Sequence, residues 1–203
     1  MEIRGKVAVV TGAGGGGQGR AVARRLAREG ASVVVSDIND LGGRETVRLI
    51  EELRGRAAFF RADVGVESDV RELIAFSEQT FGGVDILVNN AGPYFHGMPL
   101  EKWTETIHGN LMGTIYGTLY AIEAMRHRGG GAILNFGSTS AVGHGFKPSS
   151  SPAYDAAKAS ATTAPGPARK TCPSVSLPSA TATVIRAAPR PARRYWWAIS
   201  VCR

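Results

Sequence analysis

Residues 7–20 read VAVVTGAGGGGQGR, an apolar run that ends in a threonine and leads into a stretch made largely of glycine. The β-branched run predicts a short buried strand, and the apolar residues that follow at helical spacing over 20–29 predict a helix that Gly30 ends. A second apolar run at 32–36 predicts another strand, which Asp37 closes. Strand, glycine-rich turn, helix and strand in this order make a βαβ unit.

The same alternation continues along the chain. Apolar and amphipathic patterns predict further helices at 41–53, 66–81 and 103–126 and further strands at 57–60, 86–88 and 132–136. Strands that alternate with helices favour an α/β domain, in which a parallel sheet is covered on both faces. With 203 residues, 43% of them hydrophobic, the chain can build one such domain and is too short for two ordinary ones.

The net charge of +7 is unevenly distributed, because every Asp and Glu precedes Lys158. The basic excess therefore belongs to the tail. That tail has no basic helical face, no interleaved aromatic residues and no zinc-finger spacing, so we expect no nucleic acid as a partner.

Targeting and metal signals are equally weak. No signal-peptide pattern precedes the first strand, and no window approaches 18 consecutive apolar residues, so we expect no membrane partner. Two cysteines, both in the tail, do not make a disulfide framework and favour a cytoplasmic location. The histidines lack the spacing of metal ligands, so no metal site is expected.

The glycine-rich turn fits a phosphate-binding role. Glycines let the backbone approach a pyrophosphate, whose charge is met by the free N–H groups at the start of the helix. Asp37, 18 residues after Gly19, can accept hydrogen bonds from the hydroxyls of an adenosine ribose. Its carboxylate would repel a 2′-phosphate, so NAD is favoured over NADP. Arg20 is the competing cation, although it is more simply interpreted as a helix-surface residue.

Two further motifs follow. Residues 89–92, Asn-Asn-Ala-Gly, come directly after a predicted strand and form either a turn beside a cofactor or a purely structural turn. Tyr154 and Lys158 stand four residues apart, on one face of a helix. A phenol with its usual pKa of about 10 is a poor base at neutral pH, and a close ammonium favours the phenolate form. The pair is either an acid/base device or a chance spacing.

Taken in this order, the motifs resemble those of the short-chain dehydrogenase/reductase family, over residues 1 to about 160. The resemblance implies a Rossmann-like, doubly wound parallel sheet and an NAD(H)-dependent oxidoreductase that transfers a hydride between nicotinamide and an alcohol or carbonyl substrate. It also implies a small alcohol or ketone as substrate and a homodimer or homotetramer. The alternatives are an NADP-dependent reductase and a catalytically inactive, truncated dinucleotide-binding protein.

The resemblance also implies residue roles. For cofactor binding it implies Gly12, Gly17 and Gly19 as the phosphate-loop glycines and Asp37 as the ribose carboxylate. It implies Asp63 as the adenine-side contact, and Asn90 and Gly92 as the nicotinamide-side turn. For catalysis it implies Tyr154 as acid/base, Lys158 as the lysine that lowers its pKa and holds the nicotinamide ribose, Asn110 as the holder of a relay water, and Ser138 as the substrate-orienting hydroxyl.

The position of the serine is open between two residues. Ser138 has the family interval from Asn135, but its interval to Tyr154 is three residues longer than usual. An insertion around residues 149–151 would reconcile the two intervals, and Ser140 is the alternative.

The chain departs from the family pattern in its glycine motif and its tail. The motif is one residue longer than usual, with Gln18 where an apolar residue is common. Residues 164–203 hold six of the ten prolines and none of the family's later segments. Because proline interrupts helices and central strands, we expect a catalytic NAD-binding domain over 1–163 that lacks its last strands. We expect an irregular tail, disordered or translated out of frame, over 164–203.

Overall fold

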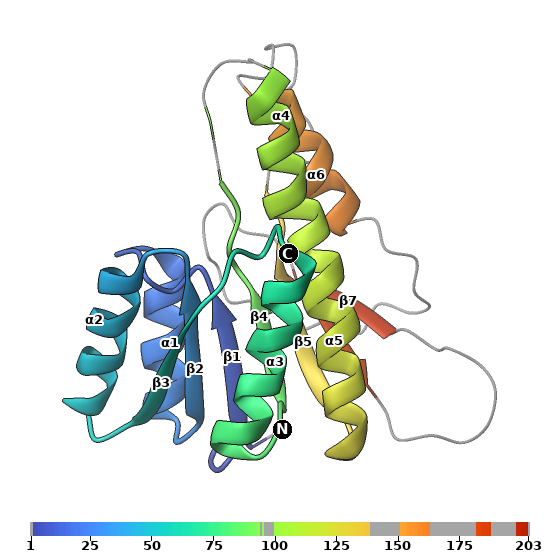
Figure 1. Cartoon of the computed structure of the whole chain (residues 1–203). Helices are drawn as coiled ribbons and strands as arrows, with labels where there is room; N and C mark the ends of the chain where they lie inside the picture. Colours follow the sequence, from blue (N-terminus) through green and yellow to red (C-terminus); the bar gives the residue numbers. More distant parts are fainter. Residues whose placement is uncertain are drawn as a thin grey trace.

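The computed structural model describes residues 2–93, 95, 100–138, 151–162, 182–187 and 198–202. Strands and helices alternate along the first 162 residues, as Figure 1 shows. In chain order they are β1 (Val7–Thr11), α1 (Gln18–Arg28), β2 (Ser32–Asp37), α2 (Asp40–Glu51), β3 (Arg56–Arg61), α3 (Glu67–Phe81), β4 (Ile86–Asn89), α4 (Leu100–Ile107), η1 (His108–Met112), α5 (Gly113–His127), β5 (Gly131–Phe136) and α6 (Pro152–Thr162).

The first five strands form a parallel sheet in the order β3-β2-β1-β4-β5. The chain moves outward from β1 in one direction and then returns to add β4 and β5 on the other side of β1. This reversal between β1 and β4 makes the sheet doubly wound, and the carboxyl ends of the five strands meet at one edge. The predicted α/β class and its parallel sheet are confirmed.

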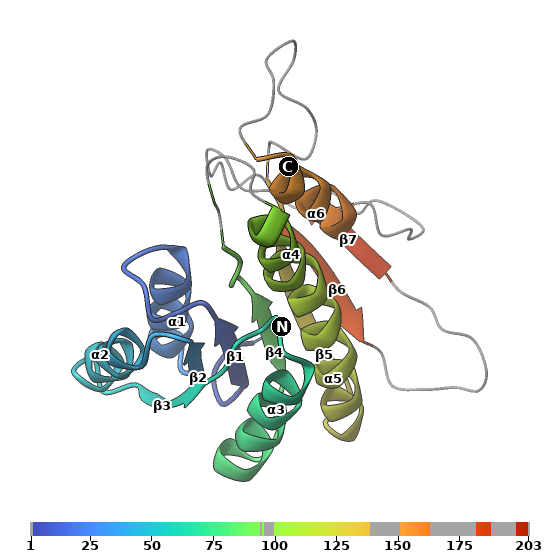
Figure 2. The ribbon, with the colours of Figure 1, turned by 45° about the horizontal axis from the view of Figure 1, so that its top comes forward.

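Alternate strand residues fill two core layers. Val9, Val34 and Leu87 pack with buried residues of α3 and α5, whereas Val10 and Val35 pack with buried residues of α1 and α2. The strands are therefore buried on both faces, as a parallel sheet requires. Figure 2, turned from the first view, separates α1 and α2 from α3 and α5 on either side of the sheet.

The long helix predicted at 103–126 is divided into α4, a π-helical turn η1 and α5. The Asn110 side chain explains the division. Its Nδ2 donates to the Thr106 carbonyl at 3.0 Å, the acceptor that an α-helix offers to the Asn110 backbone N–H. Apolar periodicity cannot reveal such a side-chain competitor.

The tail differs from its expected irregular structure at two segments. β6 (Ala182–Ala187) pairs antiparallel with β5, and β7 (Ala198–Cys202) pairs antiparallel with β6. Figure 2 shows β6 beside β5. The β6 sequence, ATVIRA, is rich in β-branched residues and contains no proline, so nothing in it opposes a strand. Proline content averaged over the whole tail concealed this. The predicted boundary at residue 163 falls outside the described residues.

None of the helices in the described ranges is long and apolar enough to cross a membrane.

Candidate functional site

The turn after β1 and the turn after β4 are fitted closely together. Gly12 has a φ of +65°, and a Cβ there would lie 2.7 Å from the Ala91 Cα. A Cβ on Gly19 would overlap the Gly12 carbonyl oxygen. The Asn90 Nδ2 donates to the carbonyls of Thr11 and Gly12 at 2.9 and 3.0 Å. Both glycines and the Asn90 amide are thus required to hold this junction, which lies at the carboxyl ends of two neighbouring strands.

Gly17 is the N-cap of α1, with no side-chain cap and no atom within 4 Å of a Cβ built on it. Residues 15–17 are all exposed. The additional residue of the glycine motif is therefore accommodated on an open arc of the loop, next to the free N–H groups of the first helical turn.

Asp37, the last residue of β2, is held in one orientation by backbone N–H groups. Its Oδ2 accepts from Gly14 N at 2.7 Å and its Oδ1 accepts from Asn39 N at 2.9 Å. A Cβ on Gly14 would lie 2.8 Å from the Asp37 Cγ. Since a carboxylate has about four lone-pair positions, Asp37 keeps acceptor capacity for a ligand.

A cleft of about 640 Å³ opens at this edge of the sheet. It is lined by predicted cofactor-site residues, namely Gly12, Asp37, Asp63, Asn90 and Gly92. Asp63 is fixed there because its Oδ1 accepts from Gly65 N at 2.8 Å. Gly17, Gly19 and the four predicted catalytic residues are not among the described residues that line it.

Sequence analysis did not identify the helical wall of the cleft. Glu101 and Glu105 of α4 and His108 of η1 line it. They lie on helices and not at the ends of strands, so the pattern of residues that close or follow a strand could not reveal them.

Asn110 connects η1 to the turn after β4 and is fully buried. Its Nδ2 donates to the Pro93 carbonyl at 2.8 Å, and a Cβ on Gly92 would overlap its Oδ1. Within the described part of the chain that Oδ1 accepts no hydrogen bond. An unpartnered buried amide oxygen is costly, so this position suits a bound donor.

The Tyr154 and Lys158 side chains lie on α6, which packs against α4, η1 and β5. The Lys158 Nζ donates to the Phe136 carbonyl at 3.1 Å and lies 5.5 Å from the centroid of the Tyr154 ring. Lys158 is only 5% exposed, and this burial lowers its pKa to about 8. Ser138 follows Phe136 by two residues and is half-buried. α6 is thereby anchored to the strand that leads to Ser138.

Ser140 and residues 149–150, where the insertion was placed, lie outside the described residues.

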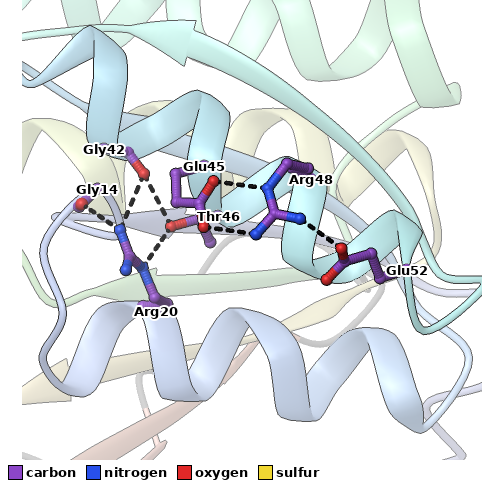
Figure 3. Close-up of polar contacts among 7 residues, drawn as sticks. All are labelled: Gly14, Arg20, Gly42, Glu45, Thr46, Arg48 and Glu52. Atoms are coloured by element: carbon purple, nitrogen blue, oxygen red, sulfur yellow. Dashed lines mark hydrogen bonds and ion pairs between the residues drawn. The ribbon is translucent and has the colours of Figure 1, made fainter.

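Arg20 differs from its interpretation as a helix-surface residue. Its Nη2 donates to the carbonyls of Gly14 and Gly42 at 2.8 and 3.1 Å, and its Nε donates to the Thr46 Oγ1 at 2.8 Å. Figure 3 shows the guanidinium between α1, the glycine-rich loop and α2. The acidic residues Glu45 and Glu52 in the same view pair with Arg48 instead.

Comparisons with known proteins agree with this arrangement. Residues 6–164 match the family model described as short chain dehydrogenase. An uncharacterized oxidoreductase of Thermotoga maritima is 39% identical over 143 residues, which are 68% of this chain and 56% of that protein. The 2,5-dichloro-2,5-cyclohexadiene-1,4-diol dehydrogenase of Sphingobium indicum is 40% identical over 147 residues, 70% of this chain and 57% of that protein. The chain thus spans little more than half the length of these relatives.

A solved structure, 7α-hydroxysteroid dehydrogenase complexed with NADH and 7-oxo glycochenodeoxycholic acid, is similar in fold. It has a TM-score of 0.73 and 35% sequence identity, and the match covers 79% of this chain and 63% of that one.

Proposed function

This chain belongs to the short chain dehydrogenase family, and we propose that it binds NAD(H) and transfers a hydride between the nicotinamide and a carbon bearing a hydroxyl or carbonyl group. The cofactor supplies the hydride donor or acceptor, while the protein supplies binding, orientation and proton transfer. The observation that carries the proposal is the cleft in which Asp37, fixed by two backbone N–H groups, faces the glycine-rich turn.

The residues present fit a dinucleotide. Gly12 and Gly19 allow the turns after β1 and β4 to pack against each other without side chains, and the start of α1 offers N–H groups to the charge of a pyrophosphate. The remaining lone pairs of Asp37 suit the two hydroxyls of an adenosine ribose. A 2′-phosphate would bring negative charge against that carboxylate, so NAD is preferred to NADP.

For the chemical step we propose Tyr154 as the residue that gives a proton to the substrate oxygen in reduction and takes it in oxidation. The buried Lys158 ammonium, 5.5 Å from the ring, favours the phenolate through its charge. Ser138 orients the substrate oxygen. The Oδ1 of Asn110, which accepts no hydrogen bond from the residues that the structure describes, supports a role in holding a water that exchanges protons with Tyr154.

The names of two similar proteins suggest the first substrates to test. One is named for a cyclohexadienediol and the other for a 7α-hydroxysteroid, and both substrates are secondary alcohols on a ring. We therefore propose cyclic secondary alcohols as the substrate class. Formation of NADH from NAD with such a panel, followed by absorbance, tests the reaction directly.

Cofactor binding is tested by titrating NADH and NADPH against the chain and following the nicotinamide fluorescence. Asp37→Ala should weaken NADH binding by about 1 to 3 kcal/mol, the range for hydrogen bonds to a charged group, and should narrow the preference over NADPH. Asp40→Ala, which removes a nearby exposed carboxylate paired with Arg44, is the matched control. An unchanged NADH to NADPH ratio in Asp37→Ala would rule out the ribose contact.

We also propose self-association through α5. Ile115 and Leu119 are 38% and 58% exposed on this helix, and an exposed apolar helical face suits contact with a second copy. Light scattering should give at least a dimer for the chain and a smaller mass for Leu119→Glu. A monomeric wild-type chain would contradict the proposal.

A further inference from the structure

The backbone of Gly14 is hydrogen-bonded on both sides of its Cα. Its N–H donates to the Asp37 Oδ2 at 2.7 Å, and its carbonyl accepts from the Arg20 Nη2 at 2.8 Å. These two groups belong to consecutive planar peptides, Ala13–Gly14 and Gly14–Gly15. The carboxylate and the guanidinium together therefore restrict the backbone rotation at Gly14 that would turn its N–H away from Asp37.

Thr46 of α2 provides a further hydrogen bond that holds the glycine-rich loop. It is fully buried, and its Oγ1 lies 2.7 Å from the Ala13 carbonyl, to which it can donate, while it accepts from the Arg20 Nε at 2.8 Å. Two successive carbonyls of the glycine-rich loop are thus held, that of Ala13 by Thr46 of α2 and that of Gly14 by Arg20 of α1. The Ala13 carbonyl lies in the same planar peptide as the Gly14 N–H that Asp37 accepts from. Figure 3 shows the contacts of Arg20 with Gly14 and Thr46. A Cβ on Gly42 would overlap the Gly14 carbonyl oxygen, so α2 approaches the loop as closely as its backbone allows.

These contacts oppose the use of Arg20 as a ligand for a 2′-phosphate. To reach a phosphate on the cleft side, the guanidinium would have to leave the carbonyls of Gly14 and Gly42 and the buried Thr46 hydroxyl. Polar groups left without partners in a buried position are destabilising, so this rearrangement is unfavourable. The guanidinium of an arginine presents its donors in a rigid plane and from separate nitrogens, whereas the donors of a lysine all lie on one atom.

We propose that Arg20, together with Thr46, is a positioning residue for the Asp37 carboxylate, and that it sets the preference for an adenosine ribose without a 2′-phosphate. Arg20 acts through the Gly14 carbonyl and, by way of Thr46, through the Ala13–Gly14 peptide, and it does not touch the cofactor. This inference rests on the proposed function, because it assumes that Asp37 binds the ribose.

The test uses ligands that report on the adenosine half alone, namely ADP-ribose and ADP-ribose 2′-phosphate, titrated by calorimetry. Three variants remove different parts of the hydrogen bonds by which Arg20 and Thr46 hold the loop. Arg20→Met removes charge and donors, Arg20→Lys keeps the charge and loses the fork, and Thr46→Val removes the hydroxyl with little change of shape or charge. Arg28→Met, an exposed arginine at the end of the same helix, is the control for net charge.

Arg20→Lys and Thr46→Val should each bind ADP-ribose about tenfold more weakly, the equivalent of about 1.4 kcal/mol. The loss of affinity of these variants for ADP-ribose 2′-phosphate should be several-fold smaller, because Asp37 does not contribute favourably to the binding of that ligand. Arg28→Met should bind both ligands within twofold of the wild-type chain. In the ligand-free chain, amide exchange at Gly14 should be faster in Thr46→Val than in the wild-type chain.

Three outcomes would overturn the inference. If Arg20→Met weakens only the 2′-phosphate ligand, Arg20 is a phosphate ligand. If the variants lose affinity for both ligands equally, or for neither, the contacts of Arg20 and Thr46 do not set the preference for ADP-ribose over its 2′-phosphate. If the wild-type chain binds neither nucleotide, the proposed function fails and this inference fails with it, whereas wild-type binding with unaffected variants removes this inference alone.

Discussion

Tyr154 is half-buried, whereas Lys158 one helical turn later is almost wholly buried and bonded to the end of β5. At the scale of single residues, this difference in burial lets proton transfer by Tyr154 be tested separately from cofactor binding, in which Lys158 also takes part. Tyr154→Phe keeps the ring and removes only the proton donor, so turnover should be abolished while NADH affinity stays within a few-fold. Lys158→Met should reduce both.

Rates of NAD reduction, measured beside NADH titrations, check this pair of variants. Equal loss of binding and turnover in Tyr154→Phe would contradict its assignment as acid/base. Tyr116→Phe, which alters a phenol on α5, is the control and should behave as the wild-type chain.

Chain order was sufficient to indicate Asp37, Asn90 and Gly92, because each closes or follows a buried strand and the carboxyl ends of parallel strands share one edge. Arg20 could not be predicted in the same way. Its partners Gly14, Gly42 and Thr46 come from the loop and from α2, and only the packing of α1 against α2 brings them together. Residues that act on a site through the backbone leave no spacing signal.

At the scale of elements, period-3.6 patterns predicted helices and short apolar, β-branched runs predicted the strands up to β5. A helix buries one face, whereas a strand of a covered parallel sheet is buried on both faces and shows no alternation. The π-helical turn was missed because one side chain, Asn110, causes it. β6 and β7 were missed because the proline content of the whole tail was taken as evidence against strands, although neither segment contains a proline.

The contact between η1 and the turn after β4 supports a prediction at this scale. In Gly92→Ala the new methyl group would overlap the buried Asn110 Oδ1, and overpacking of this kind costs about 1 to 3 kcal/mol. The variant should unfold at a lower temperature and bind NADH more weakly, because the turn that lines the cleft is displaced.

Gly16→Ala is the control for Gly92→Ala, since it adds a methyl group where no atom lies within 4 Å and where φ is not positive. Thermal unfolding of the two variants gives the comparison. If both unfold at the same temperature, the close fit of Gly92 against Asn110 is not required.

At the scale of the whole molecule, the two edges of the sheet have different roles. The carboxyl edge holds the cleft, whereas the opposite edge holds a buried carboxylate, Asp85, which is 2% exposed. It accepts from Val7 N at 2.9 Å and from the Arg128 Nη2 at 2.9 Å, and it pairs with Lys6 at 3.3 Å. Asp85 therefore ties the starts of β1 and β4 to the segment after α5.

The pKa of Asp85 reflects two opposing effects. Burial alone raises it, but the hydrogen bonds from Arg128 and Val7 and the charges of Arg128 and Lys6 outweigh burial and leave it below its usual value. A carboxyl whose pKa is lower in the folded chain stabilises the fold above the unfolded-state pKa, and this stabilisation is lost as the pH falls through the folded-state value. The lowered pKa of Lys158 acts in the same direction at higher pH, because stability rises as the pH increases from about 8 toward the unfolded-state value.

Asp85→Asn should therefore lower the free energy of unfolding at neutral pH by about 2 kcal/mol, within the range for hydrogen bonds to charged groups. The difference from the wild-type chain should shrink as the pH falls below about 4, the region in which an unfolded aspartate is protonated. Urea denaturation across this pH range measures it, with Asp40→Asn as a control whose exposed ion pair with Arg44 contributes little. NADH affinity at neutral pH should be unchanged in Asp85→Asn, because the carboxylate stands at the edge of the sheet away from the cleft. A stability difference that stays constant from neutral to acidic pH would mean that the charge of Asp85 contributes nothing and that the variant acts only through altered packing.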